Sequence, residues 1–340
     1  MRAPDVALVA RARGIGVHLV PRPALEDLAG AGDLASFGRG LRRLGSEIDP
    51  VGDASDITSV EQAIGRTAAR HVRTLARWDQ RRPGQLDALV ADQDRRTLRA
   101  ILRGAAQGAP SARRLEGLMP TRWLPARAIA ELARQPSAAA VVKQLVWLRH
   151  PYAPRLLPLV RQAHPDLLAV EVALLQGFAD RATAAAAHGD RHLREFVRER
   201  VDLGNAQNAL LLAGGPRDVA PDGCFVGGGR WLARSPFVAA ASAVSAERAL
   251  AVLRNALADS PLVSWLPHGV GDVSHVERAY FGRALRHMAS LARREPLSSA
   301  VLLWIWLRLE AQTRDLRSLA WGAALGTPQG LRVQALVTPS

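Results

Sequence analysis

The chain has 340 residues, of which 48% are hydrophobic and 22% are charged, so it can bury a large core and has the charge content of an ordinary globular protein. A single cysteine excludes an internal disulfide, and the absence of any apolar run of roughly eighteen residues argues against a membrane-spanning helix. The formal net charge of +14 is compatible with nucleic acid or an anionic membrane surface as a partner.

Two features of the basic residues weaken that indication of a polyanionic partner. The arginines are spread along the whole chain, and Lys143 is the only lysine, which together with abundant Ala, Gly and Pro indicates a coding bias. A solvated arginine surface therefore explains the charge better than a dedicated polyanion site. The stretch from Met1 to Arg13 carries four charges and no apolar block before Arg11, so we expect no secretory leader and a cytoplasmic location.

Helices are predicted along the chain, because Ala, Leu and Arg dominate and residues that favour strands are scarce. Residues 56–79 carry apolar side chains at three- and four-residue spacings, from Ile57 to Trp78, which predicts a long amphipathic helix. Prolines separate short helices before Leu148, and a glycine-rich loop spans residues 214–229. Longer helical regions are expected at residues 167–212, 236–257, 273–293 and 298–325. The predicted fold class is all-α.

An internal repeat is visible in two strings of sequence. RTLRAILRGAAQGAP at residues 96–110 and RDLRSLAWGAALGTP at residues 314–328 agree at eight of fifteen positions without a gap. Each string has the apolar spacing of a helix, which Gly104 or Gly322 weakens before a Gly-x-Pro sequence ends it. A fainter copy appears where the Arg-Trp-Leu triplet at residues 122–124 aligns with the same triplet at residues 230–232. We therefore predict a triplication.

The predicted units are residues 46–150, residues 151–260, and residues 261–340 together with residues 1–45. The third unit needs both termini, because too little chain follows Pro328 to form the helices that follow the other copies. The N-terminus can supply them, since residues 18–21 resemble residues 123–125 and the segment from Ser36 resembles that from Ser137. Three such units are expected to close into a body with pseudo-threefold symmetry.

No catalytic constellation is found in the sequence. The glycines at residues 227–229 lack the Lys-Ser/Thr of a phosphate-binding loop. His188 and His192 have the i, i+4 spacing of zinc ligands but lack a third ligand nearby, so we expect solvent-exposed histidines. Asp92 and Asp94 could hold a cation, although a role at a helix start explains them as well. We expect no catalytic, cofactor or metal site, which favours a mechanical or adaptor protein.

The segment LRLEAQTRDLRSLAWGAALGTPQGLRVQALV, residues 307–337, resembles the closing segment of the C subunit of V-type (A-type) ATPases, called the d subunit in eukaryotic enzymes. That family ends with an acidic residue, a polar spacer, an Asn/Asp-Leu-Arg sequence, a glycine turn and an apolar helix. The matching positions here are Glu310, residues 315–317, Gly322, Gly326 and residues 331–337. The internal copy at residues 92–110 is similar to the family's threefold repeat, whereas residues 205–208 (Asn-Ala-Gln-Asn) depart from it.

The resemblance implies a funnel-shaped, non-catalytic rotor subunit in the central stalk, between the membrane proteolipid ring and the rotating central shaft. It implies a monomer within the complex, peripheral to the membrane, with no cofactor and no nucleic acid. The rival class is a basic α-helical repeat protein that binds nucleic acid, with arginines concentrated on a concave surface. An enzyme is a third class, and it lacks a motif.

Three positions are candidates for contact with the shaft. Arg99 and Arg317 lie at the edge of the apolar stripe of the repeated helix, and Gln207 takes that place in the middle copy. Related by a pseudo-threefold axis, these side chains would line a central cavity and meet acidic or carbonyl groups of an inserted subunit. The alternative is that each arginine pairs with a nearby carboxylate, such as Asp94 or Glu310, and fixes helix packing. Both interpretations stay open at this point.

Overall fold

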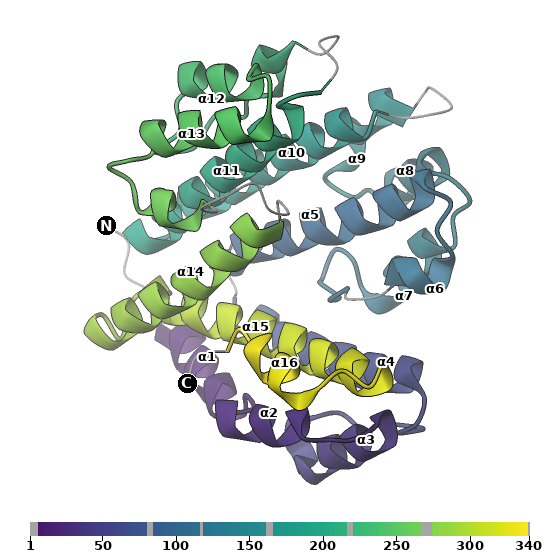
Figure 1. Cartoon of the computed structure of the whole chain (residues 1–340). Coiled ribbons are helices and arrows are strands. Elements are labelled where there is room, and N and C mark those ends of the chain that lie inside the picture. Colours follow the sequence, from purple (N-terminus) through teal and green to yellow (C-terminus); the bar gives the residue numbers. More distant parts are fainter. Residues whose placement is uncertain are drawn as a thin grey trace. The chain divides into compact units, whose positions relative to one another are not determined.

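The computed structural model describes residues 6–79, 84–115, 118–160, 166–215, 220–266 and 274–338. Over these ranges the regular elements are helices and short 3-10 turns without any strand, as the sequence predicted (Figure 1). The chain divides into two compact units. Unit 1 comprises Met1–Ala3, Arg81–Arg114 and Ala128–Arg283, and unit 2 comprises Pro4–Gln80, Leu115–Arg127 and Ala284–Ser340.

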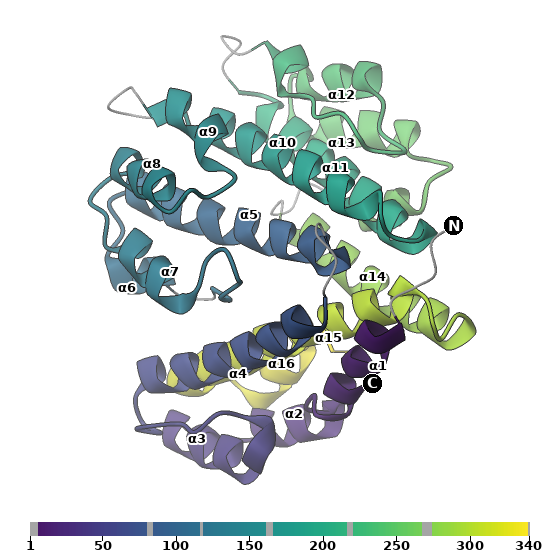
Figure 2. The same cartoon turned by 180° about the vertical axis from the view of Figure 1, so that it is seen from behind.

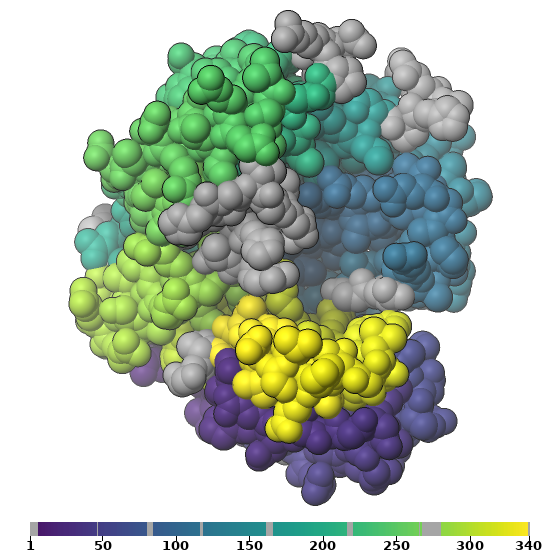
Figure 3. Space-filling view, in the orientation of Figure 1, coloured from purple at the N-terminus to yellow at the C-terminus, as the bar shows by residue number. Residues whose placement is uncertain are grey.

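Unit 2 is built from both ends of the chain around one long helix, α15 (Ser299–Ala324). The helices that pack against α15 are α1 (Val6–Val17), α2 (Arg22–Ala29), α3 (Leu34–Arg43), α4 (Ile57–Trp78) and α16 (Gln329–Gln334). A short turn, η1 (Gly45–Glu47), follows α3. The space-filling view shows the yellow C-terminal residues lying over the purple N-terminal helices (Figure 3). The two ends of the chain therefore form a single packed unit.

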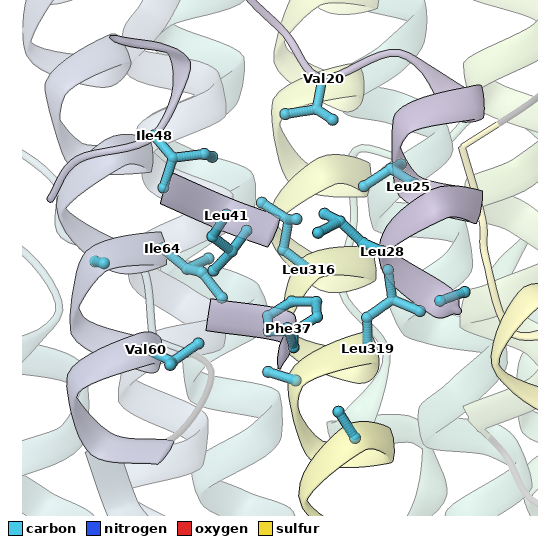
Figure 4. Close-up of a cluster of buried hydrophobic side chains, with 14 of the residues drawn as sticks. Val20, Leu25, Leu28, Phe37, Leu41, Ile48, Val60, Ile64, Leu316 and Leu319 are labelled. Carbon is cyan, nitrogen blue, oxygen red and sulfur yellow. The ribbon is translucent and has the colours of Figure 1, made fainter. Parts of the chain in front are cut away.

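One hydrophobic cluster in unit 2 joins these distant segments (Figure 4). Phe37 and Leu41 of α3 are fully buried against Leu316 and Leu319 of α15. Ile64 and its neighbours on α4 close the cluster from another side. Because these side chains come from opposite ends of the chain, burial of apolar surface is what fastens the N-terminus to the C-terminal helix.

Unit 1 holds two more long helices, α5 (Gln85–Ala106) and α11 (Arg191–Leu212), and α10 (Leu167–Ala186) packs against both (Figure 2). Helix α8 (Ala138–Trp147) packs on α5, and α12 (Arg234–Ala241) and α13 (Ala246–Ala256) pack on α11. The remaining described elements of the chain are α6 (Ser111–Leu115), α7 (Ala126–Ala133), α9 (Ala153–Leu156), η2 (Leu157–Val160), η3 (Pro221–Cys224), η4 (Pro261–Trp265) and α14 (Ser274–Arg294). The division between the two units falls inside α6, α7 and α14.

Three pairs of short helices, α2–α3, α7–α8 and α12–α13, have matching lengths and caps. The first helix of each pair, α2, α7 or α12, is 8 residues long. The second helix of each pair is capped by Asp33, Ser137 or Ser245, whose side chain accepts the N–H group three residues later. The sequence alignment starts the first of these segments at Ser36, whereas the cap is Asp33.

Helix α1 is the element that the sequence did not predict. It contains Gly14 and Gly16, which lower helix propensity and obscure its pattern. A Cβ atom on Gly16 would lie 2.5 Å from Cδ1 of Ile305, so the glycine lets α1 approach α15 closely. Arg308 of α15 also donates a hydrogen bond to the carbonyl of Gly16 over 3.1 Å. No helix in the described ranges is both long and apolar enough to cross a membrane.

Candidate functional site

Two of the three predicted partner-facing residues lie in unit 1, Arg99 on α5 and Gln207 on α11. The Arg99 guanidinium donates from Nε to Oε1 of Glu171 on α10 over 3.0 Å. Arg103, one turn later, pairs with the same oxygen over 2.6 Å. Glu171 is 6% exposed, so two arginines neutralise one buried carboxylate between α5 and α10. Gln207 is buried as well.

The third predicted residue, Arg317, lies on α15 in unit 2. Its Nε atom is 3.2 Å from Oε2 of Glu61 on α4, and its Nη2 atom donates to the carbonyl of Leu118. The other Glu61 oxygen accepts a hydrogen bond from the Trp321 indole over 3.0 Å. Burial lowers the pKa of Arg317, and Glu61 opposes that shift. This pair crosses between two long helices in the same way as the pair on α5.

Each arginine thus meets a glutamate on a neighbouring long helix. Neither partner is one of the carboxylates suggested by the sequence: Asp94 pairs with Arg181 on α10, and Glu310 accepts a hydrogen bond from Trp306. Arg99 and Arg317 belong to different units, so the structure describes their contacts separately. What it adds to the prediction is the identity of the partners, which sequence spacing along one helix could not supply.

The sequence interpretation of Asp92 as part of a helix start is wrong. Helix α5 begins at Gln85, which places Asp92 about two turns into it and fully buried. Its carboxylate is 2.9 Å from Arg95, 3.2 Å from Arg200 of α11 and 3.5 Å from Arg96. Burial works to raise the pKa of Asp92, but these three arginines outweigh it and hold the pKa well below its usual range.

Asp94 is buried beside Asp92 with its own cationic partners. Arg181 lies 3.3 Å from its carboxylate and the His150 ring 3.7 Å. The hydroxyl of Tyr152 donates to the carbonyl of Ala91 over 2.9 Å, and burial raises the pKa of Tyr152. Both aspartates are occupied by arginines, so this layer stabilises the contact of α5 with α10 and α11 and offers no open carboxylate pair for a cation. The described residues contain no group of His, Cys, Asp or Glu side chains suited to a metal ion.

The two histidines with zinc-like spacing differ in their surroundings. His188 is exposed, as expected, but His192 is 3% exposed, which contradicts the sequence interpretation. The reason is that His192 lies in the first turn of α11, on the face that packs inward. Cys224 is also buried, and burial raises the pKa of its thiol, which disfavours the reactive thiolate.

The glycine-rich loop has a structural explanation. Asp202 of α11 accepts the N–H groups of Arg230, Trp231 and Leu232 at 2.8 to 3.2 Å. A Cβ atom on Gly229 would lie 1.9 Å from Oδ1 of Asp202, so only glycine permits this approach. Burial raises the pKa of Asp202, and the three N–H groups act against that shift. The loop is therefore a docking turn for the short helix α12.

A similar docking contact closes unit 2. Gln312 of α15 accepts the N–H of Val20 over 2.7 Å just before α2 begins. A side-chain oxygen of a long helix holds the start of a short helix pair in both places. In unit 2 that pair comes from the opposite end of the chain.

A pair of buried arginines, Arg114 and Arg332, was missed in the sequence. The Arg114 side chain lies over Gly104, where a Cβ atom would be 2.8 Å from its Cγ, and donates to the carbonyl of Gln135 over 2.6 Å. Arg332 lies over Gly322 in the same way, with 2.7 Å to its Cδ, and donates to the carbonyl of Ala31 over 2.8 Å. The signal was available, because the gapless alignment of the two repeated strings, continued past their ends, pairs these arginines.

A family model and two known proteins that are similar to this chain point to the same family. The family model for the ATP synthase (C/AC39) subunit matches residues 8–331. The C subunit of the V-type ATP synthase from a strain of Thermus thermophilus is 30% identical over 291 residues, which cover 83% of this chain and 84% of the relative. The protein of the same name from a second strain of that species gives the same identity and coverage.

Proposed function

The chain belongs to the C/AC39 subunit family of V-type ATP synthases, and on that premise we propose that it is the non-catalytic rotor subunit that couples the central shaft to the membrane proteolipid ring. The observation that carries this proposal is the match over nearly the whole chain, because it runs from within α1 to within α16 and includes the helices between them. The chemistry of the buried charges supports a mechanical role. The carboxylates of Asp92, Glu171 and Glu61 are held by arginines of other turns or helices.

We propose that the body consists of three helical repeats, which differ from the two compact units of the structure. The repeats are residues 46–150, residues 151–260, and residues 261–340 with residues 1–45, and they are arranged as a funnel with pseudo-threefold symmetry. The matching lengths of α2, α7 and α12 support this division. So do the equivalent caps Asp33, Ser137 and Ser245. The packing of α2 and α3 on α15 supports the joining of both chain ends, and Ile64 of α4, from residues 46–150, completes that cluster.

A rotor part must transmit torque without shearing, which requires contacts that fix one long helix against the next. Buried ion pairs suit that task, because their geometry is directional and breaking one leaves an uncompensated charge. The Arg99–Glu171 and Arg317–Glu61 pairs join α5 to α10 and α15 to α4. We propose that the subunit sits on the cytoplasmic side, as a monomer within the complex, and reaches the membrane through the ring.

Arg99, Gln207 and Arg317 remain our proposed lining of a cavity that faces the shaft. Arg99 exposes 21% of its side chain and Arg317 exposes 12%, and the packing alternative explains both ion pairs. Replacing Arg99 and Arg317 together by glutamine separates the two roles. If the double variant keeps its melting temperature and loses the shaft subunits in a pull-down, the cavity role holds; if it loses stability first, the arginines are structural.

The function itself is tested by co-purification from membranes. A tagged copy of the chain, expressed in its native host and extracted in mild detergent, should recover the proteolipid and shaft subunits in equal amounts. Isolated protein should neither hydrolyse ATP nor bind it tightly in calorimetry. Recovery of nucleic acid without the ATPase subunits would overturn the proposal in favour of the basic repeat protein.

A further inference from the structure

An exposed apolar tip ends helix α8 in unit 1. Trp147 is 87% exposed, and its neighbours Val146 and Leu148 are 43% and 37% exposed. The turn η2, which contacts α8, adds Leu157 at 40% exposure. We name residues 146–149 together with Leu157 the α8 tip. A side chain as large as tryptophan gains more than most from burial, so its exposure points to a missing partner.

The sequence around the α8 tip is cationic and free of carboxylates. Between Glu131 and Asp166 there is no Asp or Glu, while five basic residues occur: Arg134, Lys143, Arg149, Arg155 and Arg161. Lys143 and Arg149 are exposed, and Arg155 pairs with Asp180 of α10. A partner of this surface is therefore expected to be anionic.

Arg149 ends α8 in a conformation that glycine more often adopts. Arg149 has a φ of +50° and is the only described non-glycine residue with positive φ. The corresponding position after α3 is Gly45, with a φ of +62°. A left-handed conformation is unfavourable for residues with a Cβ atom, so glycine is the ordinary choice here. Arg149 keeps this conformation because the N–H groups of Arg149 and His150 bond to the carbonyls of Val146 and Leu145, which caps the C-terminus of α8.

The α8 tip is not required by the helix pair itself. The positions that correspond to residues 146–148 are Arg254, Asn255 and Ala256 in α13 and Arg42, Arg43 and Leu44 at the end of α3. The other two pairs therefore form without an aromatic residue at this place. The apolar tip is a feature of this copy alone, which separates it from the common needs of packing.

We propose that the α8 tip docks on the surface of an anionic phospholipid bilayer. Trp147 and Leu148 enter the headgroup region, where indole rings are favoured, while Lys143 and Arg149 contact lipid phosphates. An indole that is 87% exposed protrudes from its surroundings, which suits a deformable surface better than a rigid pocket. This contact is additional to the attachment through the ring proposed above, and it can be measured on the isolated chain, without the ring.

Flotation of the purified chain with lipid vesicles tests the proposal. We expect the wild type to float with vesicles that contain roughly one third phosphatidylglycerol, less so at high salt, and weakly with phosphatidylcholine alone. The double variant Trp147→Ser, Leu148→Ser should lower the partition by about tenfold. The matched control is Trp123→Ser, since Trp123 is 40% exposed in unit 2 and should leave flotation unchanged.

Arg149→Gly separates the lipid role from a structural one. Glycine adopts a positive φ without a steric cost, so this variant should lower the partition of the protein onto vesicles without lowering its melting temperature. The proposal is overturned if the wild type does not float with anionic vesicles, or if the Trp123 control falls as far as the tip variant. It is also overturned if the tip variant floats normally but loses a protein subunit from the purified complex, because the tip is then a protein interface.

Discussion

The ends of α5 and α15 show the same local structure made with different connections. In both, a glycine inside the helix, Gly104 or Gly322, makes room for a buried arginine from the segment that follows. Arg114 donates to the carbonyl of Gln135, only 21 residues along the chain, whereas Arg332 reaches Ala31, 301 residues away. The contact at the end of α5 joins neighbouring segments of the chain, and the contact at the end of α15 joins the C-terminal segment to the N-terminal one. The comparison teaches that one geometry can serve either a local or a long-range connection.

The largest expected effect comes from the leucines that the repeat places at the same position, Leu98 and Leu316. Both are fully buried, so replacing either by alanine should cost about 2–5 kcal/mol of unfolding free energy. Denaturant unfolding measures the loss. The comparison is sharpened by hydrogen exchange, because Leu316→Ala should also expose amides of α2 and α3 while Leu98→Ala should leave them protected. Equal protection of α2 and α3 in both variants would contradict the shared core.

The middle copy of the repeat differs from the other two copies at one ionisable residue. Glu199 of α11 corresponds to Ala91 and Leu309, both buried and apolar. Burial, with Glu195 and Asp202 nearby, raises the pKa of Glu199 to about 7, against the opposing effect of Arg230 and Arg200.

Because the folded-state pKa of Glu199 lies above the unfolded value, its contribution to stability is complete below about pH 4.5 and is lost as the pH rises through about 7. Glu199→Gln should therefore stabilise the protein relative to wild type at pH 8 compared with pH 5, by on the order of 2 kcal/mol. Thermal unfolding at both pH values gives the measurement. A stability difference that does not change with pH would show that Glu199 titrates normally.

The caps of the three short helix pairs test whether the correspondence extends to local detail. Replacing Asp33, Ser137 or Ser245 by alanine should cost about 1 kcal/mol in each case, because each removes the acceptor for a helix N–H group. Ser36→Ala should cost less, since the Ser36 hydroxyl bonds to Arg39 and to the Asp33 carboxylate and accepts no helix N–H group. A loss at Ser36 as large as that at Asp33 would favour the register that begins at Ser36.

The long amphipathic helices are predictable, because a regular apolar spacing such as that from Ile57 to Trp78 leaves little choice of structure. What escapes prediction depends on partners far away in the chain. The sequence pattern places Asp92 at a helix start because Arg200, which neutralises it, lies on another helix. At the glycines of the repeat the sequence predicts only a lower helix propensity. It does not show that the Arg114 side chain fills the space above Gly104.

The glycines under the buried arginines provide the smallest and most discriminating test. In a helix interior, glycine to alanine stabilises by about 1 kcal/mol, whereas forcing a methyl group into a filled site costs about 1–3 kcal/mol. Gly65→Ala in α4 measures the gain in helix propensity without a packing cost, because its new Cβ atom would meet nothing closer than 3.8 Å. It should stabilise the protein.

At Gly104 and Gly322 the new methyl group would lie 2.8 and 2.7 Å from the arginine side chain, so the packing cost opposes the gain in propensity. Arg114 is anchored to the carbonyls of Ala109, Ala133 and Gln135, while the described bond of Arg332 goes to Ala31. Arg114 is held by more hydrogen bonds and can move aside less than Arg332. Gly104→Ala should therefore destabilise the folded protein by about 1 kcal/mol and Gly322→Ala by less. If both variants were stabilised as much as Gly65→Ala, the arginines would move aside freely, and Arg332 could not be what fastens α16 to the start of the chain.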